Sequence, residues 1–85
     1  MHDNIGELAL KVITESNDVL ETKEILEILE SSMENVTRTK LFARLNNLRG
    51  EGLIKGKFVG PGKGVWIWWA PSMFSEKITV VEVEE

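Results

Sequence analysis

The chain has 85 residues and a formal net charge of −4, with 42% hydrophobic and 28% charged residues, which favours one small globular domain over a disordered segment. It has no cysteine, no apolar run near the roughly 18 residues of a membrane span, and acids among its first apolar residues, so we expect a cytoplasmic protein without disulfides, signal peptide or membrane partner. The single histidine, His2, has no second metal ligand near it and belongs to no Ser/His/Asp set, so no metal, cofactor or enzymatic activity is expected.

The charge is distributed unevenly along the chain. Residues 1–37 hold nine acids and two lysines, and residues 64–85 hold four acids and one lysine. Residues 38–63, by contrast, hold seven basic residues and a single acid. Such a basic stretch is typical of a nucleic-acid-binding surface, although a solvated charged face would have the same composition.

Two amphipathic helices are predicted in the acidic N-terminal part. NIGELALKVITES (residues 4–16) places apolar residues at i, i+3, i+7 and i+8, with Asn4 as the N-cap. Residues 19–20 then form a short extended link. KEILEILESS (residues 23–32) has a wide apolar face with glutamates outside it, and Thr22 is its predicted N-cap.

A third helix is predicted for RTKLFARLNNLR (residues 38–49), with Thr37 as its N-cap. Leucines spaced at i, i+4 and i+7 form its buried stripe: Leu41, Leu45 and Leu48. Glycines follow at positions 50 and 52, where a left-handed residue commonly ends a helix. Phe42, beside the stripe, is expected to pack under the first helix or the hairpin rather than to stack on bases.

A β-hairpin is predicted after the third helix. LIKGKFV (residues 53–59) alternates with a period of two, so Ile54 and Phe58 share one face while the two lysines share the other. GPGKG (residues 60–64) turns the chain, and VWIWWA (residues 65–70) returns it as the second strand. The C-terminal stretch SEKITVVEVEE has a β-branched run that could add one more strand.

Three helices followed by a hairpin is the element order of the winged helix-turn-helix. TRTKLFARLNNLRGEGLI (residues 37–54) resembles the recognition helix of that family and its Gly-Leu-Ile strand start, and GPGKG stands where the family carries its wing. The stretch GKGVWIWW is similar to small archaeal winged-helix regulators. The resemblance covers residues 4–70 and implies an α+β winged helix-turn-helix in one domain, 1–85, with residues 71–85 as a tail.

The resemblance also implies DNA binding, most commonly in transcriptional regulation, with helix 38–49 in the major groove and wing 60–64 on the backbone or in the minor groove. Winged helices also serve as protein-interaction modules without nucleic-acid binding, and the acidic first two helices fit that alternative. The residues do not separate DNA from RNA.

Candidate DNA contacts follow from a helical wheel, which places a polar face opposite the leucine stripe. Threonine and asparagine can bond bases, and a small alanine permits close approach to a groove. The candidates on the helix are Arg38, Thr39, Lys40, Ala43, Arg44, Asn46 and Asn47. The two asparagines could equally solvate a late turn. Arg44 and Arg49 flank the stripe and would reach phosphates or nearby acids, although Arg49 could instead complement the helix dipole.

Lysines of the hairpin extend the candidate basic track: Lys55, Lys57 and Lys63. Lys63 lies in the glycine-rich loop, where one cation can sit on phosphate or in the minor groove. The alternative is an ordinary hairpin loop with solubilising lysines. The loop is not a phosphate-binding P-loop, because a strand rather than a helix follows it.

The tryptophan-rich strand has two unlike faces, with Val65, Ile67 and Trp69 on one and Trp66 and Trp68 on the other. One face must pack on the helices, and the other would expose an apolar patch of the kind that marks interfaces. Packing is expected rather than base stacking, and a homodimer through the Trp66–Trp69 strand and the C-terminal tail is its functional form. The tail residues that could cover the patch are Met73, Phe74, Ile78, Val80, Val81 and Val83.

Overall fold

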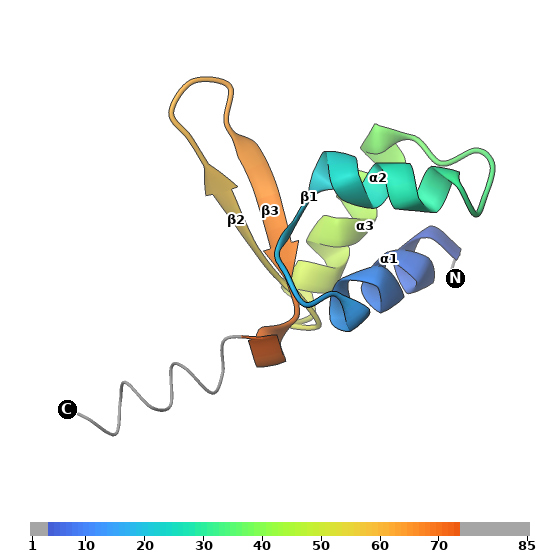
Figure 1. Ribbon diagram of the computed structural model, residues 1–85, viewed down its shortest axis with the longest axis horizontal. Helices are drawn as coiled ribbons and strands as arrows, with labels where there is room; N and C mark the ends of the chain where they lie inside the picture. The colour runs from blue at the N-terminus through green and yellow to red at the C-terminus, as the bar shows by residue number, and fades with distance from the viewer. Residues whose placement is uncertain (1–3, 74–85) are drawn as a thin grey trace.

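The computed structural model describes residues 4–73, in which three helices pack on one face of a three-stranded antiparallel sheet (Figure 1). The predicted three helices and hairpin are confirmed. In chain order the elements are α1 (Asn4–Glu15), β1 (Leu20–Glu21), α2 (Thr22–Glu30), α3 (Arg38–Gly50), β2 (Lys55–Val59), β3 (Val65–Trp69) and a 3-10 turn (Pro71–Met73). His2 and the additional strand predicted in the tail lie outside the described residues.

The core forms where the apolar faces of the helices meet. α1 buries Ile5, Ala9 and Ile13 at i, i+4 and i+8, while the predicted stripe members Leu8 and Val12 are only partly buried. The buried face is thus rotated from the predicted stripe towards Ala9, which is fully buried and, being small, leaves room for a neighbouring element to approach the centre of the helix. Among residues 4–73, no helix has the length and hydrophobicity that a membrane span requires.

The N-terminus of α2 differs from the prediction. Glu21, rather than Thr22, is the N-cap, and it forms a capping box in which the Glu21 amide donates to Glu24 Oε1 at 2.8 Å. Thr22 is the first residue of the helix and is 4% exposed. Its hydroxyl accepts a hydrogen bond of 2.8 Å from the indole Nε1 of Trp68. The Thr22 prediction was wrong because this hydroxyl turns inward to a partner 46 residues away.

α3 begins as predicted and extends one residue further. The Thr37 hydroxyl caps it by accepting from the Lys40 amide at 3.1 Å, which confirms the predicted N-cap. Leu41 and Leu45 are fully buried and Leu48 packs at the edge of the core, as the leucine spacing indicated. The helix ends at Gly50, and Gly52 follows it with a φ of +81°.

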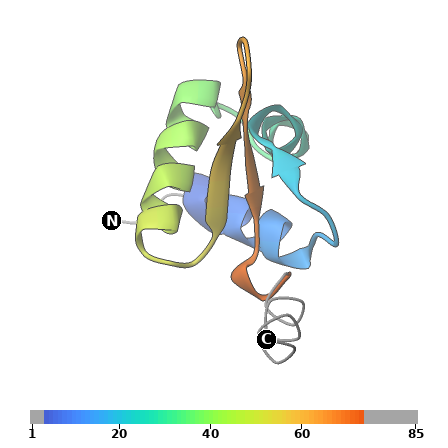
Figure 2. The ribbon, with the colours of Figure 1, turned by 90° about the vertical axis from the view of Figure 1, so that its left-hand side faces the viewer.

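The sheet has the strand order β1-β3-β2. β2 and β3 pair from Lys55 opposite Trp69 to Val59 opposite Val65, which leaves residues 60–64 as the connecting loop, as predicted. The predicted link around Leu20 is in fact strand β1, which pairs with β3 through Leu20 opposite Trp68. In Figure 2 the hairpin is in front, with α3 along one edge and β1 and α2 along the other.

The two faces of the sheet have different environments. Residues directly opposite each other on paired strands project to the same side, so Gly56 and Phe58 lie with Trp68 and Trp66 on the face that packs on the helices. The outer face carries the alternate residues of both hairpin strands: Lys55, Lys57, Val59, Val65, Ile67 and Trp69. No described helix covers this outer face (Figure 1).

Candidate nucleic-acid interface

The side of α3 that faces away from the core is an exposed polar strip. Thr39, Ala43 and Asn47 follow each other at i, i+4 and i+8, and all three are exposed. Lys40 is exposed beside them, and its Nζ lies 3.4 Å from the Asn35 carbonyl oxygen, a long contact that a stronger anionic partner could replace. The structure therefore places four of the candidate contacts, Thr39, Lys40, Ala43 and Asn47, on one accessible helix face.

The N-terminal end of α3 and the tip of the hairpin lie at the same end of the molecule (Figures 1 and 2). Arg38 and Thr39, in the first turn of α3, are exposed there. The first amides of a helix point out of its N-terminus, and together with the dipole they favour an anion at that end. Cations and helix amides are thus grouped where a duplex could contact both elements.

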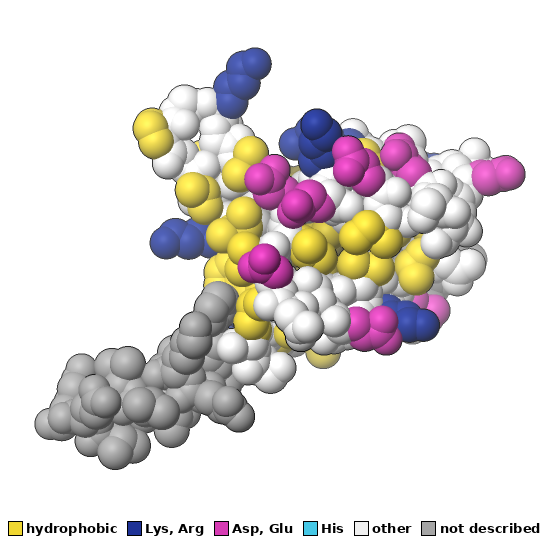
Figure 3. Space-filling view, in the orientation of Figure 1, with side chains coloured by type: hydrophobic (Ala, Val, Ile, Leu, Met, Phe, Trp, Pro, Cys, Tyr) yellow, Lys and Arg dark blue, Asp and Glu magenta, His cyan; other side chains and the backbone are white. Residues whose placement is uncertain are grey.

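The hairpin loop presents Lys63 at the projecting tip, where Figure 3 shows a basic side chain. Gly62 and Gly64 flank it with φ values of +78° and +64°, which side chains rarely adopt. The Phe58 ring lies over Gly64 so closely that a Cβ at that position would overlap it. The turn therefore requires both glycines, and the Phe58 ring additionally leaves no room for a side chain at Gly64.

Asn46 and Arg49 are turned away from the exposed strip and towards the hairpin. The Asn46 side-chain amide donates to the Phe42 carbonyl at 3.2 Å, and its Oδ1 accepts from Arg49 Nη2 at 3.4 Å. The Arg49 guanidinium lies 5.3 Å from the ring centroid of Trp66. Arg44 is half-buried and interacts within the protein. The structure thus separates Asn46 and Arg44 from Thr39, Ala43 and Asn47.

Lys55 and Lys57 are also separated from α3. Both are exposed, but strand alternation places them on the outer face of the sheet, opposite the face that carries Trp66 and Trp68. The predicted continuous basic track from α3 through both strand lysines to Lys63 is therefore divided between two faces of the hairpin.

Phe42 packs against β3, as expected. Its ring meets Trp66 edge-on at 5.9 Å and Trp68 edge-on at 6.0 Å between centroids.

The aromatic residue that strand alternation placed on the same face as Ile54 is exposed on the helix-facing side of the hairpin. Phe58 is 51% exposed, and its ring meets Trp66 edge-on at 6.1 Å. Alternation indicated its face correctly, but not that the hairpin extends past the helices at this point (Figure 1). Phe58 is thus an additional candidate for an apolar contact with a duplex, between Lys63 and α3.

Acidic side chains gather over α1 and α2 on the face shown in Figure 3. The exposed acids of these two helices are Glu7, Glu15, Glu24, Glu27 and Glu30. Figure 2 shows α2 and α3 at opposite edges of the hairpin. The fold thus converts the charge segregation seen along the chain into a spatial one, with a polyanion favoured on the α3 side.

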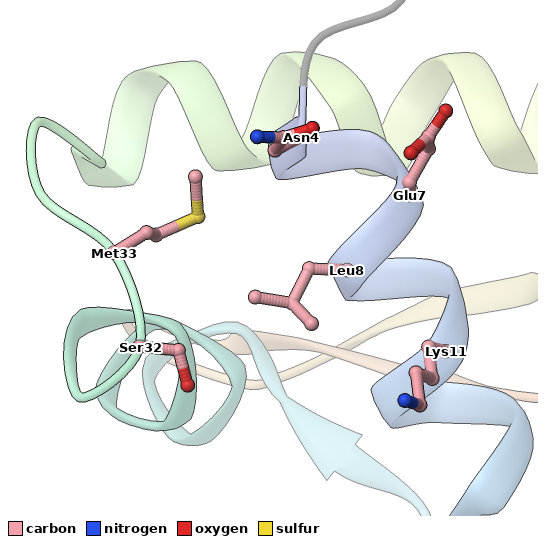
Figure 4. Close-up of a pocket in the computed structure, with 6 residues that line it drawn as sticks. All are labelled: Asn4, Glu7, Leu8, Lys11, Ser32 and Met33. Carbon is pink, nitrogen blue, oxygen red and sulfur yellow. The ribbon is translucent and has the colours of Figure 1, made fainter.

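A hollow of about 340 Å³ lies between α1 and the turn after α2 (Figure 4). Its lining residues are Asn4, Glu7, Leu8, Lys11, Ser32 and Met33. The lining includes one acidic and one basic residue together with two apolar ones, so it has no excess of charge that would select an anion. Within residues 4–73, no cluster of His, Cys, Asp or Glu is placed to hold a metal ion.

The sequence matches no protein-family model and no curated protein. The fold, however, resembles solved structures. A PadR family transcription regulator from Clostridium difficile R20291 aligns with a TM-score of 0.67 at 12% identity, over 96% of this chain and 86% of that one. The chain has the winged helix-turn-helix fold.

Two further structures are similar. Bacillus subtilis PadR in complex with operator DNA aligns with a TM-score of 0.67 at 10% identity, over 95% of this chain, which spans only 48% of that protein. A structure from work on the DNA recognition and protein interaction domains of HOP2 aligns with a TM-score of 0.64 at 23% identity, over 78% of this chain and 97% of that one. At these identities the likeness establishes the shared fold alone.

Proposed function

We propose that this chain is a DNA-binding winged-helix protein, and that it acts as a non-enzymatic transcriptional regulator in the cytoplasm. The observation that carries the proposal is the grouping of Arg38, Thr39 and Lys40 at the same end of the molecule as Lys63. Two similar structures belong to PadR transcription regulators, one of them bound to operator DNA, and this supports the proposal. The likeness to small archaeal regulators stays a prediction from the sequence.

In the proposed complex α3 enters the major groove and the wing contacts the backbone or the minor groove. Asn47 can bond adenine through its amide, Thr39 can bond a base or touch a thymine methyl, and Ala43 leaves room for the groove edge. Arg38, Lys40 and Lys63 neutralise phosphates and so set the register of the protein on the duplex without reading sequence.

The salt dependence of binding tests the proposal directly. Three engaged cations predict a slope of about −2.7 for log K against log salt, so binding should weaken roughly fortyfold between about 50 and 200 mM salt. Fluorescence anisotropy with a labelled mixed-sequence duplex measures this. If the protein does not bind the duplex at the lower salt concentration, it is not a DNA-binding protein and the proposal is wrong.

A charge-reversal pair locates the binding face. Arg38→Glu with Lys40→Glu should reduce DNA affinity by more than tenfold, because it places two acids at the N-terminus of α3. Lys11→Glu with Lys23→Glu changes the net charge equally, at exposed positions on α1 and α2, and should have a much smaller effect. Equal losses in both double variants would mean that overall charge, rather than α3, controls binding.

A second candidate function, protein interaction, is favoured by the outer face of the hairpin. Val59 and Val65 are 41% and 38% exposed there, beside Ile67 and the strand lysines. A homodimer through β3 would have to use this outer face, because Trp66 and Trp68 are turned towards the helices. We propose this face as the self-association surface. Of the tail residues predicted to cover it, those after Met73 lie outside the described residues.

A further inference from the structure

The guanidinium of Arg49 lies against the base of the wing rather than at the DNA end of α3. It stands 5.3 Å from the centroid of Trp66, within the range of a cation–π interaction. Its aliphatic stem passes over Gly56, where an added Cβ would lie 3.2 Å from Arg49 Cδ. Arg49 is in the last turn of α3, so its side chain links the C-terminal end of that helix to both hairpin strands.

The orientation of this guanidinium is maintained within α3. Asn46 donates to the Phe42 carbonyl at 3.2 Å and accepts from Arg49 Nη2 at 3.4 Å, which directs the plane of the guanidinium towards the hairpin. A cation in the last turn also complements the negative end of the helix dipole. The side chain is therefore held in place by its own helix before any ligand is present.

The strand that Arg49 contacts is anchored on both sides. Trp66 and Trp68 stack at 5.3 Å with an interplanar angle of 20°, and Phe42 meets both rings edge-on. On the other side, the Trp68 indole donates to Thr22 of α2. Trp68 is fully buried, whereas Trp66, nearer the hairpin tip, is only half-buried. Trp66 is therefore the last residue of β3, counted towards the tip, that packs against the helices, and Arg49 lies on its ring.

A small tilt at this position has a large effect at the tip. Lys63 is three residues beyond Trp66, roughly 10 Å along an extended strand. A tilt of about 10° at Trp66 would move the tip by nearly 2 Å, which is enough to misplace a phosphate contact.

We propose that Arg49 is a positioning residue: it fixes the angle between the wing and α3 in the free protein, and thereby holds Lys63 and the α3 strip in the orientation in which both contact one duplex. The effect of Arg49 on DNA affinity rests on the proposed function. Its effect on the angle of the hairpin rests only on the contacts of its side chain with Trp66 and Asn46. This role of Arg49 is distinct from a phosphate contact, although the side chain is a cation in the basic segment.

The test compares Arg49→Ala and Arg49→Lys with Lys63→Ala. We expect Arg49→Ala to weaken binding by about threefold to tenfold, in line with the usual strength of a cation–π contact. The salt slope should stay unchanged, because Lys63 still reaches its phosphate in the complex and the lost affinity is the cost of ordering a loosened wing on binding. Lys63→Ala should instead flatten the slope by about 0.9, since it removes one phosphate contact. Arg49→Lys should restore part of the affinity, because an ammonium can sit over Trp66 without holding the Asn46 contact as well.

Two other results would overturn the inference. A slope flattened by about 0.9 in Arg49→Ala would make Arg49 a phosphate contact. A lowered melting temperature with unchanged affinity, measured where the variant is fully folded, would make it a stabilising residue without influence on the wing.

The inference can also fail independently of DNA binding. Arg49→Ala should shift the tryptophan emission to longer wavelength and accelerate amide hydrogen exchange in Lys55–Val59, because Trp66 loses its cover. If both stay as in the unsubstituted protein, Arg49 does not hold the hairpin. If the emission and the exchange both change in Arg49→Ala, but neither this variant nor the unsubstituted protein binds DNA, the proposed function is wrong. The role of Arg49 in positioning the hairpin would then still stand.

Discussion

At the scale of single residues, the hydrogen bond between Thr22 and Trp68 joins α2 to the centre of the sheet. Trp68 is fully buried, so its indole N–H needs an acceptor within the protein, and the Thr22 hydroxyl is 2.8 Å away. Thr22→Val keeps the shape but removes the acceptor. We expect the free energy of unfolding to fall by about 1–3 kcal/mol, measured by urea denaturation followed by tryptophan fluorescence.

Thr22→Ser is the control, because it keeps the hydroxyl and should retain most of the stability. A Thr22→Val variant as stable as the unsubstituted protein would show that the indole finds another acceptor, and that the pairing of α2 with β3 rests on apolar contact alone.

At the scale of elements, α3 and the hairpin approach each other across Gly56. An alanine Cβ there would lie 2.6 Å from two carbons of the Trp68 ring, so the ring, and with it β3, would have to move. Gly56→Ala should cost about 1–3 kcal/mol of stability by overpacking, measured by thermal or urea unfolding. In a strand with free space around the glycine, a glycine-to-alanine substitution would be neutral or stabilising. A loss of stability of this size would therefore show that α3 and the hairpin are in close contact at Gly56.

Gly50→Ala is the matched control. It lies in the last turn of α3 with no atom within 4 Å of the added Cβ, and it should be neutral or stabilising by up to about 1 kcal/mol. If both alanine variants proved equally stable, the contact of Trp68 over Gly56 would not be as close as the structure shows.

At the scale of the whole molecule, the fold presents several surfaces of different chemistry: an α3 side with the candidate DNA contacts, an acidic side over α1 and α2, and the apolar outer face of the sheet. If the outer face mediates self-association, sedimentation equilibrium should show a concentration-dependent dimer, and Val65→Glu should shift it towards monomer. A charge at a buried apolar interface is costly, whereas an exposed one on the monomer is not.

Ile28→Glu serves as the control for that experiment, because Ile28 is 43% exposed on α2, away from the hairpin. Dimers that dissociate equally in both variants would place the interface elsewhere. A protein that stays monomeric at every concentration would exclude the homodimer and leave the outer face for another partner.

Sequence patterns of short range predicted most of the elements and part of the candidate site. The leucine spacing in α3, the Thr37 cap and the 60–64 loop were identified, and the exposed strip of Thr39, Ala43 and Asn47 followed from the leucines opposite it. Asn46 was placed with them because a wheel orders residues by angle alone. Its side chain instead bonds the Phe42 carbonyl and Arg49, and the Arg49 guanidinium lies over Trp66 on another element.

The sequence by itself determined the order of the three helices and the hairpin, the apolar stripes and the segregation of charge, because these depend on residues a few positions apart. Only the tertiary structure decided that Trp66 and Trp68 turn inward, since a period of two makes both strand faces equivalent until one meets a core. It also decided the pairing of Leu20 with Trp68 and the inward hydroxyl of Thr22. These contacts join residues more than forty positions apart, and no local spacing encodes them.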